Sequence, residues 1–224
     1  MVLRSVTKPK NALDVAIIDY KMSNLHSVQA ACSKMKLKSA ITSDQDLILK
    51  AKSAILPGVG GFGEAMVHIK ELKLDKCIKD FIETGKPFVG ICLGMQLLFT
   101  ESEEYGHHKG LGIVEGQVIK FDFPKISDER YPVPQIGWNR IMENDSGWNG
   151  TLLKDNNNGD FMYFVHSYYV IPSNINISVS HTSYGSFEYC SALNNENIFA
   201  FQFHPEKSSD DGLKIYKCLK ERVR

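Results

Sequence analysis

The first residues whose types and spacing suit chemistry form the segment Gly90-Ile91-Cys92-Leu93-Gly94. An apolar run, 88–91, leads into it, and a helical pattern over 93–99 follows. A cysteine between two glycines at a strand-to-helix turn is typical of a nucleophile elbow, with Cys in the place of Ser. Such a turn projects the thiol into a cleft at the positive end of the helix, where the Leu93 N–H can donate to an oxyanion. The alternative is a buried cysteine packed between two core glycines.

A second candidate segment lies far along the chain, at Phe203-His204-Pro205-Glu206. In extended chain, residues two apart point to the same side. His204 and Glu206 can therefore pair, and the carboxylate can hold the imidazole in the tautomer that a Cys–His–acid triad needs. The alternative is a loop histidine beside a surface glutamate.

The third candidate is the Gly-rich stretch over residues 57–63, PGVGGFG, which follows an apolar run. Its backbone N–H groups can face an anion. The stretch also matches the GxGxxG pattern of dinucleotide-binding loops, but it begins with Pro57 and does not follow the first strand. A second oxyanion donor for Cys92 is the interpretation that fits better. A tight turn and a non-catalytic dinucleotide-binding module are the alternatives.

Four other side chains are weaker candidates for site residues. Gln96 stands one helical turn after Cys92 on the same side, so it can contact a substrate or pack against a neighbouring helix. His107 and His108 are adjacent in a Gly-flanked loop and are interpreted as solvated. His166 lies in an apolar run, which favours a core or cleft histidine over a metal ligand. These histidines therefore predict no metal site.

The elements that must position these residues fall into two patterns. From residue 14 to about residue 100, short apolar runs alternate with helical patterns, which predicts an open α/β sheet with parallel pairing. From about residue 110 to 203, β-branched and aromatic runs between turn residues predict antiparallel hairpins, and residues 211–223 return to a helical pattern. The expected buried strands are Val15–Ile18, 54–56 and 88–91. We expect a single domain over 14–224, after an N-terminal tail over 1–13.

Composition excludes several function classes. The 224 residues carry 26 Lys and Arg against 26 Asp and Glu, whereas a protein held to nucleic-acid phosphates shows a basic excess. The five cysteines are widely spaced without a CxxC, which argues against a disulfide framework or a zinc site and favours a reducing cytosol. No apolar run approaches the roughly 20 residues of a membrane helix.

In this order, the Gly-rich loop, the GxCxG elbow and the His-x-Glu pair resemble the class I glutamine amidotransferases. Residues 85–96, GKPFVGICLGMQ, and 201–208, FQFHPEKS, are similar to the two main motifs of that family. The segments IIDY at 17–20, GWN at 137–139 and YFVHSY at 163–168 narrow the resemblance to glutaminase subunits of imidazole glycerol phosphate synthase. The likeness runs from about Val15 to the C-terminus and implies a three-layer, mostly parallel sheet with added antiparallel strands.

The resemblance also implies a role for each matched position. Cys92 would attack the carboxamide of L-glutamine, His204 would carry the proton to the leaving ammonia, and Glu206 would orient His204. Leu93 and a loop N–H at Val59 or Gly60 would form the oxyanion hole, once the loop reorients in response to the partner. The positions that match substrate-binding residues are Gly58, Gln96, Glu104, Ser167 and Tyr168. The positions that match partner-facing residues are Trp138, Tyr163 and Lys207.

The partner implied by the resemblance is a (β/α)8 cyclase subunit, which would use the ammonia in histidine biosynthesis as part of a cytoplasmic heterodimer. No metal or cofactor is implied. Three positions depart from the family pattern: Lys21 and Ser23 replace glycines, and Gln135 stands where His is common. Ser23 is also placed to cap the helix that follows it. The departures concern the partner surface and keep a paralogous glutaminase for surface-polysaccharide sugar amidation as an alternative. A cysteine hydrolase or peptidase is the alternative from another enzyme class.

Overall fold

The computed structural model describes residues 12–224 except 23–24, 123–124, 127–128 and 146. Residues 1–11, most of the expected tail, and Ser23, the expected helix cap, lie outside the described residues. Leu13 is buried, and its carbonyl oxygen accepts a hydrogen bond of 3.0 Å from the Lys52 N–H, so the folded part of the chain includes it. Over the described ranges, no helix has the length and apolar character needed to cross a membrane.

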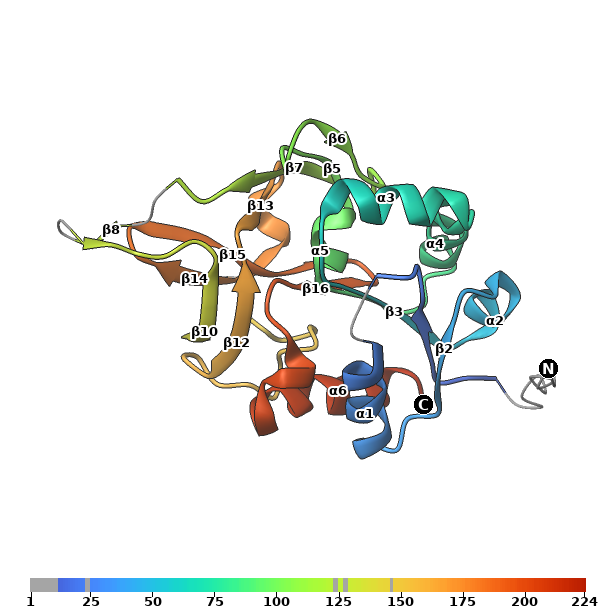
Figure 1. The fold of residues 1–224 in the computed structure, drawn as a ribbon. Helices are drawn as coiled ribbons and strands as arrows, with labels where there is room; N and C mark the ends of the chain where they lie inside the picture. The colour runs from blue at the N-terminus through green and yellow to red at the C-terminus, as the bar shows by residue number, and fades with distance from the viewer. Residues whose placement is uncertain (1–11, 23–24, 123–124, 127–128, 146) are drawn as a thin grey trace.

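A mixed sheet of eight strands forms the middle layer of the described chain (Figure 1). Its order is β11-β14-β15-β16-β4-β3-β1-β2, with parallel pairing from β16 to β2 and antiparallel pairing from β11 to β16. The strands are β11 (Met142–Glu143), β14 (Ser178–Tyr184), β15 (Phe187–Asn195), β16 (Ile198–Phe201), β4 (Phe88–Cys92), β3 (Ser53–Gly58), β1 (Val15–Ile18) and β2 (Ser39–Thr42). This sheet confirms the predicted α/β class.

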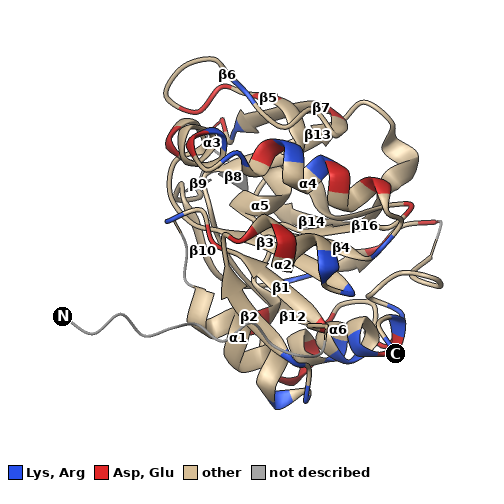
Figure 2. Cartoon of the chain, turned by 90° about the vertical axis from the view of Figure 1, so that its right-hand side faces the viewer, with Lys and Arg blue, Asp and Glu red and all other residues tan. Residues whose placement is uncertain are grey.

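Helices cover both faces of this sheet. Figure 1 shows α1 and α6 on one face and α3, α4 and α5 on the other. The helices are α1 (Leu25–Lys34), α2 (Gln45–Lys50), α3 (Phe62–Glu71), α4 (Leu74–Glu83), α5 (Leu93–Leu97) and α6 (Ser209–Arg222). In α4 the buried residues recur at helical spacing, which is why this segment packs as an amphipathic helix. Figure 2 shows acidic and basic residues together on the outer faces of α3 and α4.

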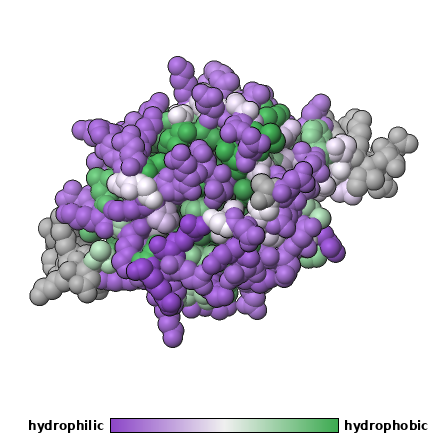
Figure 3. Space-filling model, turned by 180° about the vertical axis from the view of Figure 1, so that it is seen from behind, coloured by the Kyte–Doolittle hydropathy of each residue, from purple (hydrophilic) through white to green (hydrophobic). Residues whose placement is uncertain are grey.

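Two smaller sheets complete the part that bears on the site. One sheet has the order β13-β7-β5-β6, and β10 pairs with β12 in an antiparallel ribbon. Their bounds are β5 (Phe99–Ser102), β6 (His108–Lys109), β7 (Val114–Lys120), β10 (Gln135–Arg140), β12 (Phe161–His166) and β13 (Tyr168–Pro172). A short pair, β8 (Lys125–Ile126) with β9 (Glu129–Arg130), stands apart from them. Figure 3 shows the molecule from behind the view of Figure 1, and this face is mostly hydrophilic, with smaller apolar areas.

The structure differs from the predicted elements in two places. The helix predicted over 93–99 ends at Leu97, because Phe99 begins β5 and pairs with Val114 of β7. The sequence patterns predict neither β2 nor α2. Strand β2 lies at the sheet edge and all its residues are only half-buried, so it lacks the continuous apolar run that marks a buried strand.

Candidate active site

Cys92 ends β4 in a strained backbone conformation, with φ 53° and ψ −112°. A non-glycine residue in such a region costs on the order of 1–3 kcal/mol and is held there by its surroundings. Close packing supplies that constraint: a Cβ on Gly94 would overlap the carbonyl oxygen of Leu56 in β3. A Cβ on Gly90 would lie 3.0 Å from the Gly94 carbonyl oxygen. The two glycines therefore allow the tight turn that the sequence predicted around Cys92.

The sulfur of Cys92 lies between the ends of two other elements. Cys92 is 6% exposed. Its Sγ donates to the Val165 carbonyl oxygen of β12 at 3.8 Å and accepts from Gln202 Nε2, which follows β16, at 3.7 Å. The thiol is thus held between the parallel sheet and the β10–β12 ribbon.

His204 lies near Cys92 because β16 and β4 are parallel neighbours, paired through Phe201 and Ile91. Parallel strands end at the same edge of a sheet, so the residues that follow them lie close together. His204 Nδ1 lies 2.8 Å from Glu206 Oε1, and both side chains are only 3% exposed. The structure thus brings the predicted His–Glu pair together and buries it.

The charge balance at His204 favours the imidazolium. Burial lowers the pKa of His204, but the adjacent Cys92 and Glu206 outweigh burial and raise it well above the ordinary value. Glu206 is bound at Nδ1, whereas Nε2 is buried and has no hydrogen-bond partner among the described residues. Nε2 is therefore the nitrogen available to exchange a proton with Cys92.

A cavity of about 170 Å³ opens beside the Cys92 sulfur. Its lining residues are Val59, Gly60, Cys92, Leu93, Gln96, Glu104, Val165, His166, Ser167 and Tyr168. The cavity thereby gathers the elbow, the Gly-rich loop after β3 and four of the five expected substrate-binding positions. Ser167 and Tyr168 reach it because the chain passes from β12 to β13 at Ser167.

Gly58, the fifth expected substrate-binding position, has a different place. It pairs with Cys92 in the sheet, and a Cβ added there would overlap the Tyr20 hydroxyl and lie 2.9 Å from Leu93 Cβ. The small size of Gly58 is therefore explained by packing between β1 and the elbow. The following Gly60 has φ +110°, a conformation that favours glycine, and lies against Met22.

Glu104 connects the cavity to α3. Its Oε2 accepts a 2.5 Å hydrogen bond from the N–H of Phe62, the first residue of α3. Burial raises the pKa of Glu104, and the Phe62 N–H and nearby His108 oppose that rise. A carboxylate here can meet a cation in the cavity and also hold the helix that follows the Gly-rich loop.

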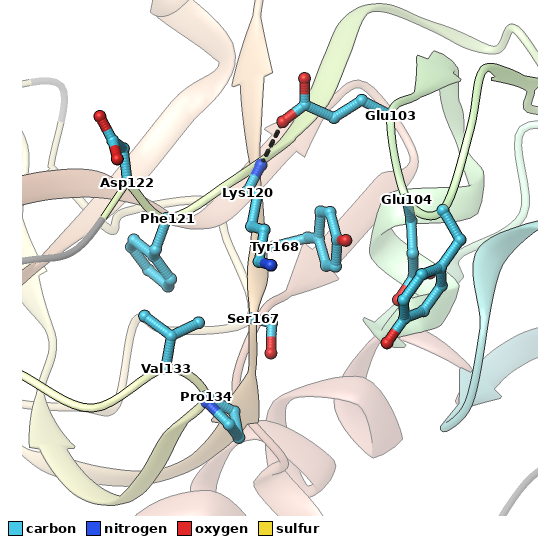
Figure 4. A pocket seen from close by; sticks show the side chains of 10 residues that line it. Glu103, Glu104, Lys120, Phe121, Asp122, Val133, Pro134, Ser167 and Tyr168 are labelled. Atoms are coloured by element: carbon cyan, nitrogen blue, oxygen red, sulfur yellow. Dashed lines mark hydrogen bonds between the residues drawn. The ribbon is translucent and has the colours of Figure 1, made fainter.

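A wider cavity of about 510 Å³ adjoins the first and shares Glu104, Ser167 and Tyr168 with it. Figure 4 shows Glu104 on one side of the Tyr168 ring and Lys120 on the other. The Lys120 backbone N–H donates to Glu103 Oε1 at 2.7 Å. The three shared residues therefore form the boundary between the wider cavity and the space beside Cys92.

His166 is a cavity residue, as one of its two interpretations predicted. Its Nδ1 lies 2.9 Å from the Tyr168 carbonyl oxygen and its Nε2 3.2 Å from the Tyr189 hydroxyl. Burial lowers its pKa to about 4, so the imidazole is neutral near pH 7. Among the loop histidines, His107 is exposed as predicted, whereas His108 is half-buried and packs against Gly63, which corrects the prediction for that residue.

Of the expected partner-facing residues, Trp138 and Tyr163 lie on the β10–β12 ribbon, and Lys207, in the turn after His204, lies beside Tyr163. Trp138 is 50% exposed, and its ring centroid lies 6.0 Å from that of Tyr163. Lys207 Nζ lies 5.8 Å from the centroid of the Tyr163 ring. Ile136, two residues before Trp138, is 62% exposed, and sequence analysis did not single it out. We refer to Ile136, Trp138, Tyr163 and Lys207 as the ribbon patch.

The departures from the family pattern lie elsewhere. Gln135 is buried and accepts a hydrogen bond of 2.9 Å from the Tyr189 hydroxyl, so its side chain faces inward from β10. Lys21 has φ 70°, the region that glycine adopts freely. Its N–H donates to Asp19 Oδ1 at 2.8 Å, which holds the turn after β1. Neither described departure is part of the ribbon patch.

Comparison with known proteins identifies the class to which this fold and site belong. The family model for glutamine amidotransferase class-I matches residues 16–217, so the chain belongs to that family. Within this family, the chain groups with curated relatives that are named imidazole glycerol phosphate synthase subunit HisH. The relative from Rhodopirellula baltica is 44% identical over 201 residues, covering 90% of this chain and 94% of the relative. The relative from Aquifex aeolicus is 42% identical over 208 residues, covering 92% and 96%.

Solved structures agree on the fold. The structure of PurLQS from Thermotoga maritima superposes with a TM-score of 0.71 at 18% identity, covering 94% of this chain and 98% of that one. A glutamine amidotransferase from the same organism gives a TM-score of 0.64 at 13% identity, covering 95% and 98%.

Proposed function

We propose that this chain is the glutaminase subunit of an imidazole glycerol phosphate synthase and that it hydrolyses L-glutamine to glutamate and ammonia. The observation that carries the proposal is the strained Cys92 at the cavity wall, with the buried His204–Glu206 pair beside it. The membership in the HisH group supports the choice of synthase.

The reaction begins with the Cys92 thiol giving its proton to His204 Nε2, while Glu206 holds Nδ1. The sulfur then attacks the side-chain carbonyl carbon of glutamine. The Leu93 N–H and a loop N–H at Val59 or Gly60 stabilise the oxyanion of the tetrahedral intermediate. When that intermediate collapses, the C–N bond breaks, and ammonia leaves with the proton from His204.

The second half of the reaction releases glutamate. Water gives a proton to His204 and attacks the γ-glutamyl thioester, and the Cys92 sulfur leaves and recovers the proton. The α-ammonium group of glutamine suits Glu104, whose half-buried carboxylate faces the same cavity as Cys92. Gln96, Ser167 and Tyr168 complete the substrate site.

The ribbon patch is the proposed docking surface for a (β/α)8 cyclase subunit in a cytoplasmic heterodimer with lyase activity. The patch touches the catalytic machinery through the backbone of Tyr163. Its carbonyl oxygen accepts from the His204 N–H at 2.9 Å, and its N–H donates to Ser208 Oγ at 3.0 Å. A partner bound at Tyr163 would therefore lie next to His204, the histidine that protonates the leaving ammonia.

The experiment that tests the function is a pair of assays on Cys92→Ser in complex with a cyclase subunit of histidine biosynthesis. We expect glutamine-dependent formation of imidazole glycerol phosphate to fall by at least about a thousandfold, because the nucleophile is lost. Turnover with free ammonium should stay normal, since the cyclase does not need Cys92. Normal glutamine use by the variant would refute the nucleophile assignment.

The same assays separate the acceptor alternatives. If the wild-type chain hydrolyses glutamine but activates only a sugar amidation enzyme, the synthase assignment is wrong while the glutaminase assignment stands.

A further inference from the structure

Gln202 is a fully buried amide that the proposed reaction does not use. It lies between the end of β16 and His204, and its backbone N–H donates to the Ser191 carbonyl oxygen at 2.9 Å. Burying an amide side chain is costly unless its polar atoms are hydrogen-bonded. Both ends of this amide are satisfied, and both partners belong to the candidate active site.

The two ends of the Gln202 amide bind different site residues. Nε2 lies 3.7 Å from Cys92 Sγ, and Oε1 accepts a 3.0 Å hydrogen bond from Gln96 Nε2. Gln96 Nε2 also donates to the Tyr168 carbonyl oxygen at 2.9 Å. Two acceptors therefore use both hydrogens of the Gln96 amide, which assigns its orientation. The carbonyl oxygen of Gln96 is the atom left for a ligand in the cavity.

We propose that Gln202 is a positioning residue of the glutaminase, which donates to the Cys92 sulfur and orients the Gln96 amide for substrate. The proposal rests on the proposed function. Gln202 does not line the cavity and acts through Cys92 and Gln96.

The Cys92 sulfur has two described hydrogen-bond neighbours, Val165 and Gln202, and the contrast between them explains why this donor matters. The Val165 carbonyl oxygen is an acceptor and favours the protonated thiol, whereas Gln202 Nε2 is a donor and favours the thiolate. A hydrogen bond to a charged group is stronger than one to a neutral group. Gln202 thus favours the thiolate after the proton has moved to His204.

The orientation of the Gln96 amide affects the binding of glutamine rather than the chemical step. Without an acceptor at residue 202, the Gln96 amide loses one of the two contacts that fix its direction. A rotated amide would present donors where the substrate needs an acceptor. Loss of Gln202 should therefore raise KM for glutamine as well as lower kcat.

The test compares alkylation of Cys92 by iodoacetamide in the full chain, followed by mass spectrometry of the peptide that contains Cys92. Gln202→Met, which keeps the size but removes donor and acceptor, should slow alkylation about tenfold, the ratio expected for a hydrogen bond to a charged group. Its kcat should fall to a similar extent and its KM for glutamine should rise. A folded Gln202→Met that reacts at the wild-type rate overturns the proposal.

A second variant, Gln202→Glu, provides a pH signature and an independent decision if Gln202→Met does not fold. Its protonated carboxyl can still donate to sulfur, whereas the ionised carboxylate repels the thiolate. The alkylation rate of the variant relative to wild type should therefore fall as pH rises between about 6 and 9. The other ionisable groups of the site, Cys92, His204, Glu206 and His166, are the same in both proteins, so the ratio isolates residue 202. A ratio constant with pH indicates a merely structural role and contradicts the proposal.

The matched control is Gln117 in β7, which is exposed and belongs to a different sheet from β4. Gln117→Met and Gln117→Glu should alkylate at the wild-type rate. Alkylation needs no glutamine turnover, so the two hypotheses fail separately. A wild-type chain that hydrolyses no glutamine with its cyclase partner refutes the proposed function, whereas the alkylation ratios still decide the role of Gln202.

Discussion

At the scale of single residues, the positive φ angles of Cys92 and Lys21 have different consequences. Cys92 has φ 53° at the cavity wall, and Lys21 has φ 70° in the turn after β1. The strain at Cys92 places a nucleophile. No described contact joins the Lys21 side chain to the site, so the positive φ of Lys21 does not position a site residue.

The first residue-scale prediction concerns Lys21→Gly. Because a left-handed conformation costs a side-chain-bearing residue about 1 kcal/mol, we expect the variant to gain up to about that much free energy of unfolding. Urea denaturation measures the gain. Lys34→Gly, in α1, is the control and should lose about 1 kcal/mol. A comparable loss for Lys21→Gly would contradict the assignment of strain.

The second residue-scale prediction is a pH dependence due to His166. Its folded-state pKa, about 4, lies below the unfolded value, so the unfolded chain binds the extra proton between the two. Stability should therefore be lost as pH falls from about 6.5 to about 4, by up to about 3 kcal/mol. His166→Gln cannot take up this proton, and its stability should fall less over the same range. Equal pH slopes in denaturant titrations of the two proteins would refute the buried neutral state.

At the scale of elements, the loop after β16 is attached to β12 by two hydrogen bonds, and a third lies within the loop. The Ser208 hydroxyl donates to the His204 carbonyl oxygen at 2.6 Å and accepts from the Tyr163 N–H, while the His204 N–H donates to the Tyr163 carbonyl oxygen. Ser208 is fully buried. The position of His204 thus depends on packing between two elements rather than on its own loop.

The element-scale prediction is that Ser208→Ala leaves the Tyr163 N–H unpaired and loosens His204. We expect a loss of about 1–3 kcal/mol in the free energy of unfolding. We also expect kcat to fall about tenfold with little change in KM, because the substrate site is untouched. Ser33→Ala, exposed in α1, should change neither quantity. A normal kcat in Ser208→Ala would show that this hydroxyl does not position His204.

At the scale of the whole molecule, the β10–β12 ribbon bears the ribbon patch, and the end of β12 borders the cavity beside Cys92. Trp138 points outward from β10, whereas Val165 and His166 of β12 line the cavity. A partner bound to the patch would lie one strand away from Cys92. The layout suits a glutaminase that transfers ammonia to a neighbour.

The whole-molecule prediction is that Trp138→Ala weakens the complex with the cyclase subunit by about tenfold or more, as expected for an exposed aromatic anchor. Isothermal titration calorimetry measures the affinity. Ile175→Ala is the control, since Ile175 is 68% exposed outside the ribbon patch. Unchanged binding by Trp138→Ala would place the docking surface elsewhere.

Sequence patterns identified much of this architecture because they are local. The apolar runs of β1, β3 and β4 and the stripe of α4 mark elements buried along their length. Strand β2 and helix α2 were not predicted, and α5 ends at Leu97, before the predicted end at residue 99. The edge position of β2 and the pairing of β5 with β7 decide the first and the last of these. Such pairings involve residues far apart in the chain, which no local pattern encodes.

The sequence by itself determined the reactive groups, which are a cysteine flanked by glycines and a histidine two residues before a glutamate. Each pattern spans only a few neighbouring residues, so the local chain conformation is enough to produce it. Only the tertiary structure decided that they meet, since Cys92 and His204 adjoin through the parallel pairing of β4 with β16. The same pairing brings Gln202 to the sulfur, and the passage from β12 to β13 brings Ser167 and Tyr168 to the cavity. Contacts of this kind follow from the packing of whole elements, so they appear only once the chain is folded.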